Sequence, residues 1–254
     1  MSTVHICGTL CVIIMNHETQ LMNITKLEAL LKENKNELGI QKWNQRYSKS
    51  KGLKSYGIGL TVLRKISKQI GRDHDLALKL WQSNFYDARI VSLLIDDPKQ
   101  ITREQVELQV EDLKQGHLAH VFSSCGAPLA KTSFVIPLLV DWIESKNTMR
   151  QSCGYGLLYE VSKSKKKSAP SDDFFLKRIQ TISETFQKVH KVVLLSMGGA
   201  LIGIGKRNLR LNTSALKVAK LIGPIHFESN SDCEPLDVVK HLTSDYIKNK
   251  LSIK

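Results

Sequence analysis

The amino-acid sequence predicts an all-α protein whose helices pair and stack into an α-solenoid. Apolar residues recur three or four positions apart along most of the chain, the spacing that gives a helix one apolar face. Capping residues stand before several of these segments. The β-branched pairs Ile13-Ile14 and Val192-Val193 are too short to predict a sheet. Short helices joined by short corners favour an irregular stack over a bundle, although no clean sequence repeat is present.

Residues 73–98 carry the clearest helical hairpin. Asp73 is placed to cap the first helix by accepting backbone N–H bonds. The polar pair Ser83-Asn84 forms the corner, and Pro98 ends the second helix because it lacks an N–H and clashes with the preceding turn. Neither helix buries its apolar face alone, so the hairpin needs further helices beside it.

The rest of the chain supplies those helices. Thr25 with Glu28, and Thr102 with Gln105, have the spacing of capping boxes, and each pair predicts a helix start. The other predicted helices span approximately residues 60–70, 134–144, 148–162, 174–187, 191–205, 213–222 and 235–250.

The 254 residues, 42% of them hydrophobic, are enough for one large core or a continuous stack. We expect residues 23–254 to form a single domain and residues 1–22 to be a ragged segment outside it. The apolar stretch Val4–Met15 is far shorter than the ~20 residues that span a bilayer. Five scattered cysteines without a CxxC pair predict reduced thiols, and therefore a cytoplasmic protein. In a bacterium we expect it at the nucleoid. We expect a monomer with no metal, cofactor or membrane contact.

The charge is strongly positive and uneven. Lysine and arginine number 37 against 24 acidic residues, a net charge of +13. Seven cations between residues 32 and 54, including Lys42 and Arg46, face only two glutamates. A second basic run at residues 163–167 is explained equally well as a solvated loop. Over the whole chain this excess predicts binding to phosphate backbones by counterion release.

The aromatic residues divide into two groups. Trp81, Trp142 and Phe134 fall on apolar helix stripes and are predicted to lie in the core. Trp43 and Tyr47 lie among cations, so they either border a nucleic-acid groove or pack inside the fold.

Several segments of the chain resemble the AlkD-like DNA alkylation repair proteins. Their order between residue 47 and the C-terminus is more specific than any single motif. The segments are YGIGLTVLRKISKQIG, GRDHDLALKLWQSNFYDARIVSLLIDDP, VEDLKQGHLAHVFSS, and MGGALIGIGKRN followed by HFESNSDCEPLD.

The resemblance implies an α-solenoid of HEAT-like repeats whose basic concave face holds duplex DNA. In active members of the family an aspartate and two tryptophans face a nucleotide that carries an N3- or N7-alkylated purine, and its glycosidic bond breaks without base flipping. The carboxylate is needed because the deoxyribose gains oxocarbenium character, which a fixed negative charge stabilises. The aromatic faces attract the cationic base.

The chain departs from the family pattern at each of these positions. Aligning GHLAH with the family's aromatic-x-x-x-Asp segment places Gly116 at the first aromatic position and His120 at the catalytic aspartate. The segment SMGGALIG places Gly199 at the second aromatic position, where the missing side chain would let a phosphate backbone approach the helix. Arg150 matches a phosphate-contacting arginine of the family.

An imidazole at position 120 does not replace an aspartate. With an ordinary pKa of about 6.5, it is mostly neutral in the cytoplasm, and its protonated form would repel an oxocarbenium. It would serve as a general base on water, a role worth about 10²–10⁴-fold, as a DNA contact, or as a half-buried residue bonded to the backbone. His117 shares its helix face and is a candidate DNA contact. With Cys125 the two histidines form an incomplete metal-ligand set.

Three functions follow from the sequence. The first is a DNA-binding protein of the alkylation repair family that holds duplex DNA, alkylated or irregular, by phosphate contacts and has weak or no glycosylase activity. The second is an active alkylpurine DNA glycosylase that uses His120 or a carboxylate at a position not yet identified. The third is a protein-interaction scaffold, since α-solenoids also bind peptides in their concave grooves.

Overall fold

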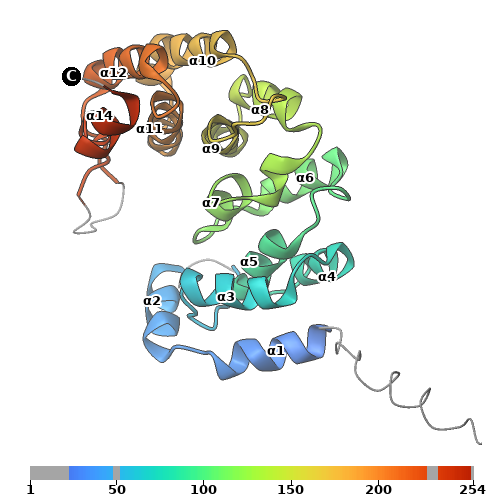
Figure 1. Ribbon diagram of the computed structural model, residues 1–254. Coiled ribbons are helices and arrows are strands. Elements are labelled where there is room, and N and C mark those ends of the chain that lie inside the picture. The colour runs from blue at the N-terminus through green and yellow to red at the C-terminus, as the bar shows by residue number, and fades with distance from the viewer. Residues whose placement is uncertain (1–22, 48–51, 228–233, 253–254) are drawn as a thin grey trace, which may run out of the picture.

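A computed structural model describes residues 23–47, 52–227 and 234–252, which form a curved stack of helices (Figure 1). The predicted ragged segment 1–22 lies outside the described residues. Within them no β-strand forms, and only two isolated bridges occur. The all-α solenoid prediction is therefore confirmed.

The helices are α1 (Ile24–Glu33), α2 (Glu37–Tyr47), α3 (Leu60–Ile70), α4 (His74–Trp81), α5 (Tyr86–Ile95), α6 (Arg103–Gln109), α7 (Leu118–Ser123), α8 (Val135–Ile143), α9 (Thr148–Ser162), α10 (Asp172–Thr185), α11 (Lys191–Gly205), α12 (Leu209–Ile222), α13 (Val238–Leu242) and α14 (Asp245–Leu251).

The helices form two layers that follow an arc. Helices α7, α9 and α11 lie on its inner side, while α4, α6, α8 and α10 follow the outer side (Figure 1). Apolar side chains from both layers meet between them, and Trp142, Tyr155 and Phe175 are among the largest that are fully buried. Because each helix pair buries its apolar stripe against its neighbours, the core runs along the whole arc.

The predicted hairpin at residues 73–98 is present as α4 and α5. Asp73 caps α4 by accepting a hydrogen bond from the Leu76 N–H at 2.9 Å. The hydroxyl of Ser92 donates to the Ala77 carbonyl oxygen at 2.7 Å and fastens the two helices together. The helices predicted at 60–70, 148–162 and 191–205 also have the predicted bounds.

Two predicted helix starts and one predicted helix are wrong. Asn23 rather than Thr25 caps α1, because its side-chain oxygen accepts from the Lys26 N–H at 2.9 Å. Helix α12 begins at Leu209, four residues before the predicted start, because Asn208 caps it. The helix predicted at residues 235–250 is broken, since Thr243-Ser244 separates α13 from α14. The capping box at Thr102 is confirmed.

Helix α2 has no predicted counterpart. None of its residues is buried, so its apolar stripe is too weak to reveal it in the sequence. It docks through a close backbone contact and through the half-buried ring of Trp43, which packs against the core. Gly39 approaches Gly57 so closely that a Cβ at residue 39 would lie 2.2 Å from the Gly57 carbonyl oxygen. Gly57 has a φ of +71°, which favours glycine there as well.

The buried carboxylate of Asp87 holds the loop that receives α2. It accepts hydrogen bonds from the Tyr56 N–H at 2.7 Å, the Ile58 N–H at 3.1 Å and the Ser55 hydroxyl at 2.9 Å. Burial raises the pKa of Asp87 above its ordinary value, although these hydrogen bonds oppose the rise. This one side chain therefore sets the path of residues 55–58.

The described helices include none with the length and apolar composition that crossing a bilayer would require.

We expect Asp87→Ala to lower the free energy of unfolding by about 3 kcal/mol, because it leaves three donors in a buried region without an acceptor. Denaturant unfolding followed by circular dichroism measures the change. Glu28→Ala removes an exposed carboxylate from α1 and serves as the control. Equal stability of the two variants would contradict this role of Asp87.

Candidate nucleic-acid interface

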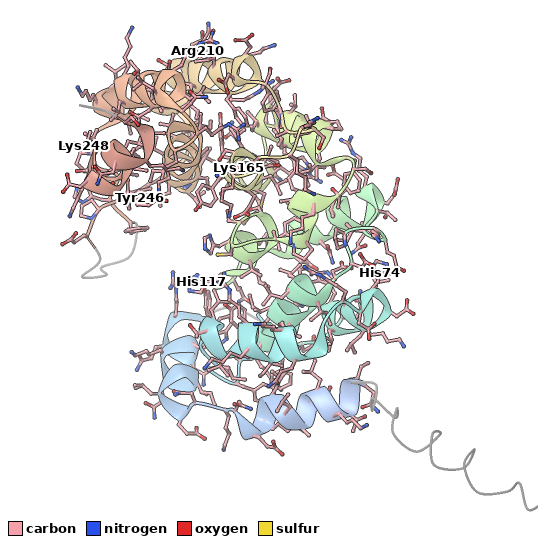
Figure 2. All side chains as sticks on the ribbon, in the orientation of Figure 1. His74, His117, Lys165, Arg210, Tyr246 and Lys248 are labelled. Atoms are coloured by element: carbon pink, nitrogen blue, oxygen red, sulfur yellow. The ribbon has the colours of Figure 1, made fainter. Side chains whose placement is uncertain are left out.

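A hollow of about 260 Å³ lies between α2, the loop at 55–60 and the turn at 116–117. Figure 2 shows His117 at the open side of the arc, whereas His74 and Arg210 lie on its outer rim. The structure thus brings together two distant stretches that the sequence nominated separately. Six predicted site residues line this hollow: Lys42, Trp43, Arg46, Tyr47, Gly116 and His117.

Aromatic rings form the floor of the hollow. The ring of Trp43 lies between those of Tyr47 and Tyr86, with centroid distances of 4.5 and 4.4 Å. The Trp43 indole N–H donates to the Leu53 carbonyl oxygen at 2.8 Å. The rings of Trp43 and Tyr47 therefore pack in the fold and also border the hollow, and the nucleic-acid groove there stays a prediction.

The turn at Gly116 rests on these rings. The Gly116 N–H donates to the Tyr47 hydroxyl at 2.7 Å, and the His117 N–H donates to the Tyr86 hydroxyl at 3.2 Å. Burial raises the pKa of Tyr86 to about 12, so its hydroxyl keeps its proton. Gly116 has a φ of +58°, and a Cβ there would lie 2.5 Å from a Tyr86 ring carbon. Rings from α2 and α5 therefore occupy the space beside Gly116, which is predicted to stand at the family's first aromatic position.

The cations of α2 lie on its exposed side. Lys42 and Arg46 are one turn apart, so they share a helix face. Both side chains are exposed, and within the described residues no carboxylate forms an ion pair with either. The Arg46 guanidinium carbon lies 5.8 Å from the centre of the Tyr47 ring. The hollow therefore has an uncompensated positive rim beside an aromatic floor.

His120 lies on α7, next to the hollow. Its Nε2 is 2.6 Å from the thiol sulfur of Cys125, and the His117 and His120 ring centroids are 6.5 Å apart. Partial burial lowers the pKa of His120, and the charges of His117 and Arg64 lower it further, while Glu160 opposes them. The imidazole is therefore neutral at physiological pH and carries no negative charge for an oxocarbenium.

The histidine pair does not extend to a metal centre in the described part of the chain. There, no group of three His, Cys, Asp or Glu side chains has an arrangement that would hold a metal ion.

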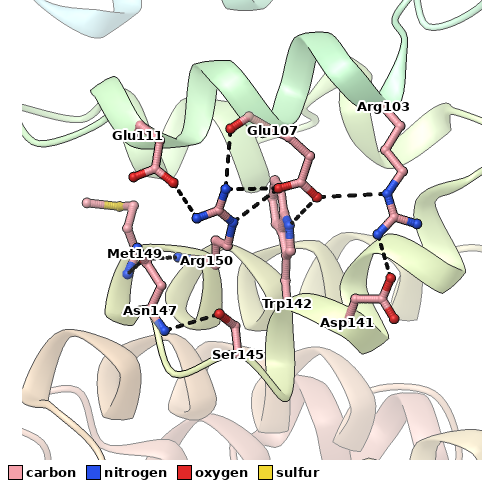
Figure 3. A network of polar contacts seen from close by, with 9 residues as sticks. All are labelled: Arg103, Glu107, Glu111, Asp141, Trp142, Ser145, Asn147, Met149 and Arg150. Carbon is pink, nitrogen blue, oxygen red and sulfur yellow. Dashed lines mark hydrogen bonds and ion pairs between the residues drawn. The ribbon is translucent and has the colours of Figure 1, made fainter.

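Arg150 is held by carboxylates from α6 and the turn that follows it. Its guanidinium forms ion pairs with Glu107, at 3.0 Å, and with Glu111 (Figure 3). Glu107 also accepts from the Trp142 indole N–H at 3.0 Å. This network fastens α6 to α8 and α9 and balances the positive charge of Arg150. Arg150 was predicted to contact a phosphate, but its positive charge is already compensated by these two glutamates within the fold.

Two glycines of α11, Gly199 and Gly203, differ in their surroundings. A Cβ at Gly199 would meet no atom within 4 Å, so this position opens onto free space. A Cβ at Gly203 would lie 2.4 Å from the Ser162 hydroxyl oxygen and 2.8 Å from a Tyr159 ring carbon, so Gly203 serves close helix packing. Trp81 and Trp142 lie in the core, as predicted, and Phe134 packs against it half-buried.

Sequence reasoning missed two residues of this surface. Tyr86 carries the Gly116–His117 turn, yet its position in an apolar stripe marks it only as a core residue. Arg64 is exposed on α3 and its charge reaches His120, but nothing in the sequence links positions 56 apart. The only signal in the sequence is that Arg64 falls on the polar, exposed face of the helix predicted at residues 60–70.

Comparison with known proteins places these observations in context. The family model for DNA alkylation repair enzyme matches residues 27–229. Two curated relatives, uncharacterised proteins from Listeria monocytogenes and Listeria innocua, are 27% and 25% identical over 221 residues. Each alignment covers 86% of this chain and 93% of the relative.

A solved structure has the same fold, with a TM-score of 0.75 and 17% identity over 92% of this chain and 97% of the other. That protein is described as belonging to a new family related to the HEAT-like repeat DNA glycosylases, with affinity for branched DNA structures.

Alanine at Gly116 and alanine at Gly199 have opposite expected effects. Gly116→Ala should lower the free energy of unfolding by about 1–3 kcal/mol, because alanine is strained at positive φ and its Cβ meets Tyr86. Gly199→Ala should raise it by about 1 kcal/mol, because alanine favours a helix interior and meets no atom there. Thermal or denaturant unfolding measures both. A destabilised Gly199→Ala or a neutral Gly116→Ala would contradict the described geometry.

Proposed function

The chain belongs to the DNA alkylation repair enzyme family, and on that premise we propose that it binds DNA through phosphate contacts on the inner face of the arc, without efficient cleavage of the glycosidic bond. The hollow at α2 carries this proposal, because it gathers Lys42 and Arg46 beside an aromatic floor. Uncompensated cations there would release counterions from a phosphate backbone.

Branched DNA is the ligand that the fold favours. The protein with the matching fold has affinity for branched DNA structures. An arc whose open side carries the hollow with Lys42 and Arg46 would accept the irregular outline of a junction, and the aromatic rings beside these cations would suit unstacked bases. We therefore expect junction DNA to bind more tightly than linear duplex of equal length.

Weak or absent glycosylase activity follows from the charges on this face. The developing oxocarbenium needs a fixed negative charge nearby, and His120 is neutral and in contact with the Cys125 thiol. A Trp at position 199 or 116 would supply an attractive aromatic face, but both positions are glycine. The site would therefore hold DNA without stabilising the transition state of base release.

The salt dependence of affinity tests the phosphate contacts. For about five contacts, log affinity plotted against log salt concentration should have a slope of roughly −4 to −5. The double variant Lys42→Glu/Arg46→Glu should make this slope shallower by about 2, because two contacts are lost. Fluorescence anisotropy with a labelled four-way junction measures it.

The matched control is Lys79→Glu/Lys217→Glu, which makes the same change in net charge at exposed positions of α4 and α12. Its slope should equal that of the wild type. A wild-type slope near zero, or an equal loss in both double variants, would overturn the proposed interface.

Base release from methylated duplex DNA tests the absence of efficient catalysis. We expect the wild type and His120→Ala to release N7-methylguanine and N3-methyladenine no faster than the buffer control. Chromatography of the released bases measures this. If the wild type releases these bases and His120→Ala does not, the imidazole is a working base. If His120→Ala still releases them, a carboxylate elsewhere in the protein is the catalytic group.

A further inference from the structure

A second cationic hollow lies near the opposite end of the arc from α2. It opens where α9, α11 and α14 end, and its volume is about 510 Å³, many times the ~30 Å³ that one water occupies in the liquid. Figure 2 shows Lys165 at the level of α9, away from the outer rim marked by Arg210. Five cations line the hollow, which we call the C-terminal cationic pocket: Lys163, Lys165, Lys206, Arg207 and Lys250.

Three of these cations have partners within the fold. Lys163 pairs with Glu160 at 2.6 Å, and no acidic residue lines the pocket itself. Arg207 donates to the carbonyl oxygens of Ser162 at 2.5 Å and Ser164 at 2.9 Å. Lys250 donates to the carbonyl oxygen of Lys206 at 2.8 Å. Arg207 and Lys250 thus satisfy carbonyls at the ends of α9 and α11 and offset the negative ends of their dipoles.

Lys165 and Lys206 are left without such partners. In the part of the chain that the structure describes, neither amino group forms an ion pair or a hydrogen bond. Burial lowers the pKa of Lys206, and the charge of Lys250 lowers it further. The positive charges in this pocket therefore repel one another, and a bound anion would relieve both the repulsion and the burial of charge.

The pocket adjoins the face that carries His120. Glu160, which pairs with Lys163 at the pocket, also acts electrostatically on His120. Gly203 lines the pocket, and Gly199 lies one helical turn before it on the same side of α11. The open position at Gly199 therefore lies one helical turn from a residue that lines the C-terminal cationic pocket.

We propose that the C-terminal cationic pocket binds consecutive phosphates of a DNA strand, as a second anchor in addition to the hollow at α2. This inference rests on the proposed DNA-binding function. Two anchors on one surface would hold DNA at two points along the arc, and Lys165 and Lys206 would supply the charge that neutralises phosphates.

The test uses the full chain and the double variant Lys165→Gln/Lys206→Gln. These two lysines are chosen because Arg207 and Lys250 also hold helix ends, so replacing those would disturb the fold. The variant should bind a labelled four-way junction about tenfold or more weakly at 0.1 M salt, with a slope shallower by about 2. Lys177→Gln/Lys217→Gln, at exposed positions on α10 and α12, is the matched control and should bind as the wild type does.

A second measurement separates DNA from a small anion as the source of the phosphate. Pyrophosphate should raise the melting temperature of the wild type and not that of Lys165→Gln/Lys206→Gln. If pyrophosphate acts in this way while junction affinity is the same in both proteins, the pocket serves a small anion, and the inference of a DNA anchor is overturned.

The outcomes also separate this inference from the proposed function. If the wild type binds the junction with a steep slope and the pocket variant matches the control, the second anchor fails while the interface at α2 stands. If the wild type binds no DNA, the proposed function fails and the anchor with it. Weaker, less salt-dependent binding by the pocket variant alone supports the anchor.

Discussion

The buried carboxylate of Asp87 links the fold to the surface that we assign to DNA. By accepting hydrogen bonds from Ser55, Tyr56 and Ile58, it fixes the loop against which α2 packs. Helix α2 has no fully buried residue of its own, and it rests on that loop through Gly39 and on Tyr86 through the Trp43 ring. Its cations and rings then face the 116–117 turn. The buried side chain of Asp87 thus helps to determine where the exposed cations Lys42 and Arg46 lie.

Local chemistry explains which helices could be predicted. Asp73 marks a helix start because its capping bond lies within three residues, and a strong apolar stripe locates α3. The position of α2 depends on a close approach between Gly39 and Gly57, which no local pattern encodes. The break between α13 and α14 was likewise hidden, because apolar periodicity continues across Thr243-Ser244.

In the candidate site, too, the sequence predicted single residues but not the tertiary contacts between them. Charge density nominated Lys42 and Arg46, and resemblance nominated Gly116 and its neighbours, yet their union in one hollow depends on tertiary packing. Arg150 shows the converse, because its residue type suggests a phosphate contact while Glu107 and Glu111 compensate its charge. Partners distant in the chain determine whether a cation is available, and a single sequence does not reveal them.

The proposed DNA interface is the inner surface around α2 and the 116–117 turn. Hydrogen exchange followed by mass spectrometry, with and without four-way junction DNA, is the decisive test. We expect slower exchange of backbone amides at residues 39–47, 55–60 and 116–120 when DNA is bound, and unchanged exchange in α4 and α12 on the outer side. Protection confined to the outer helices, with no change at those three segments, would contradict it.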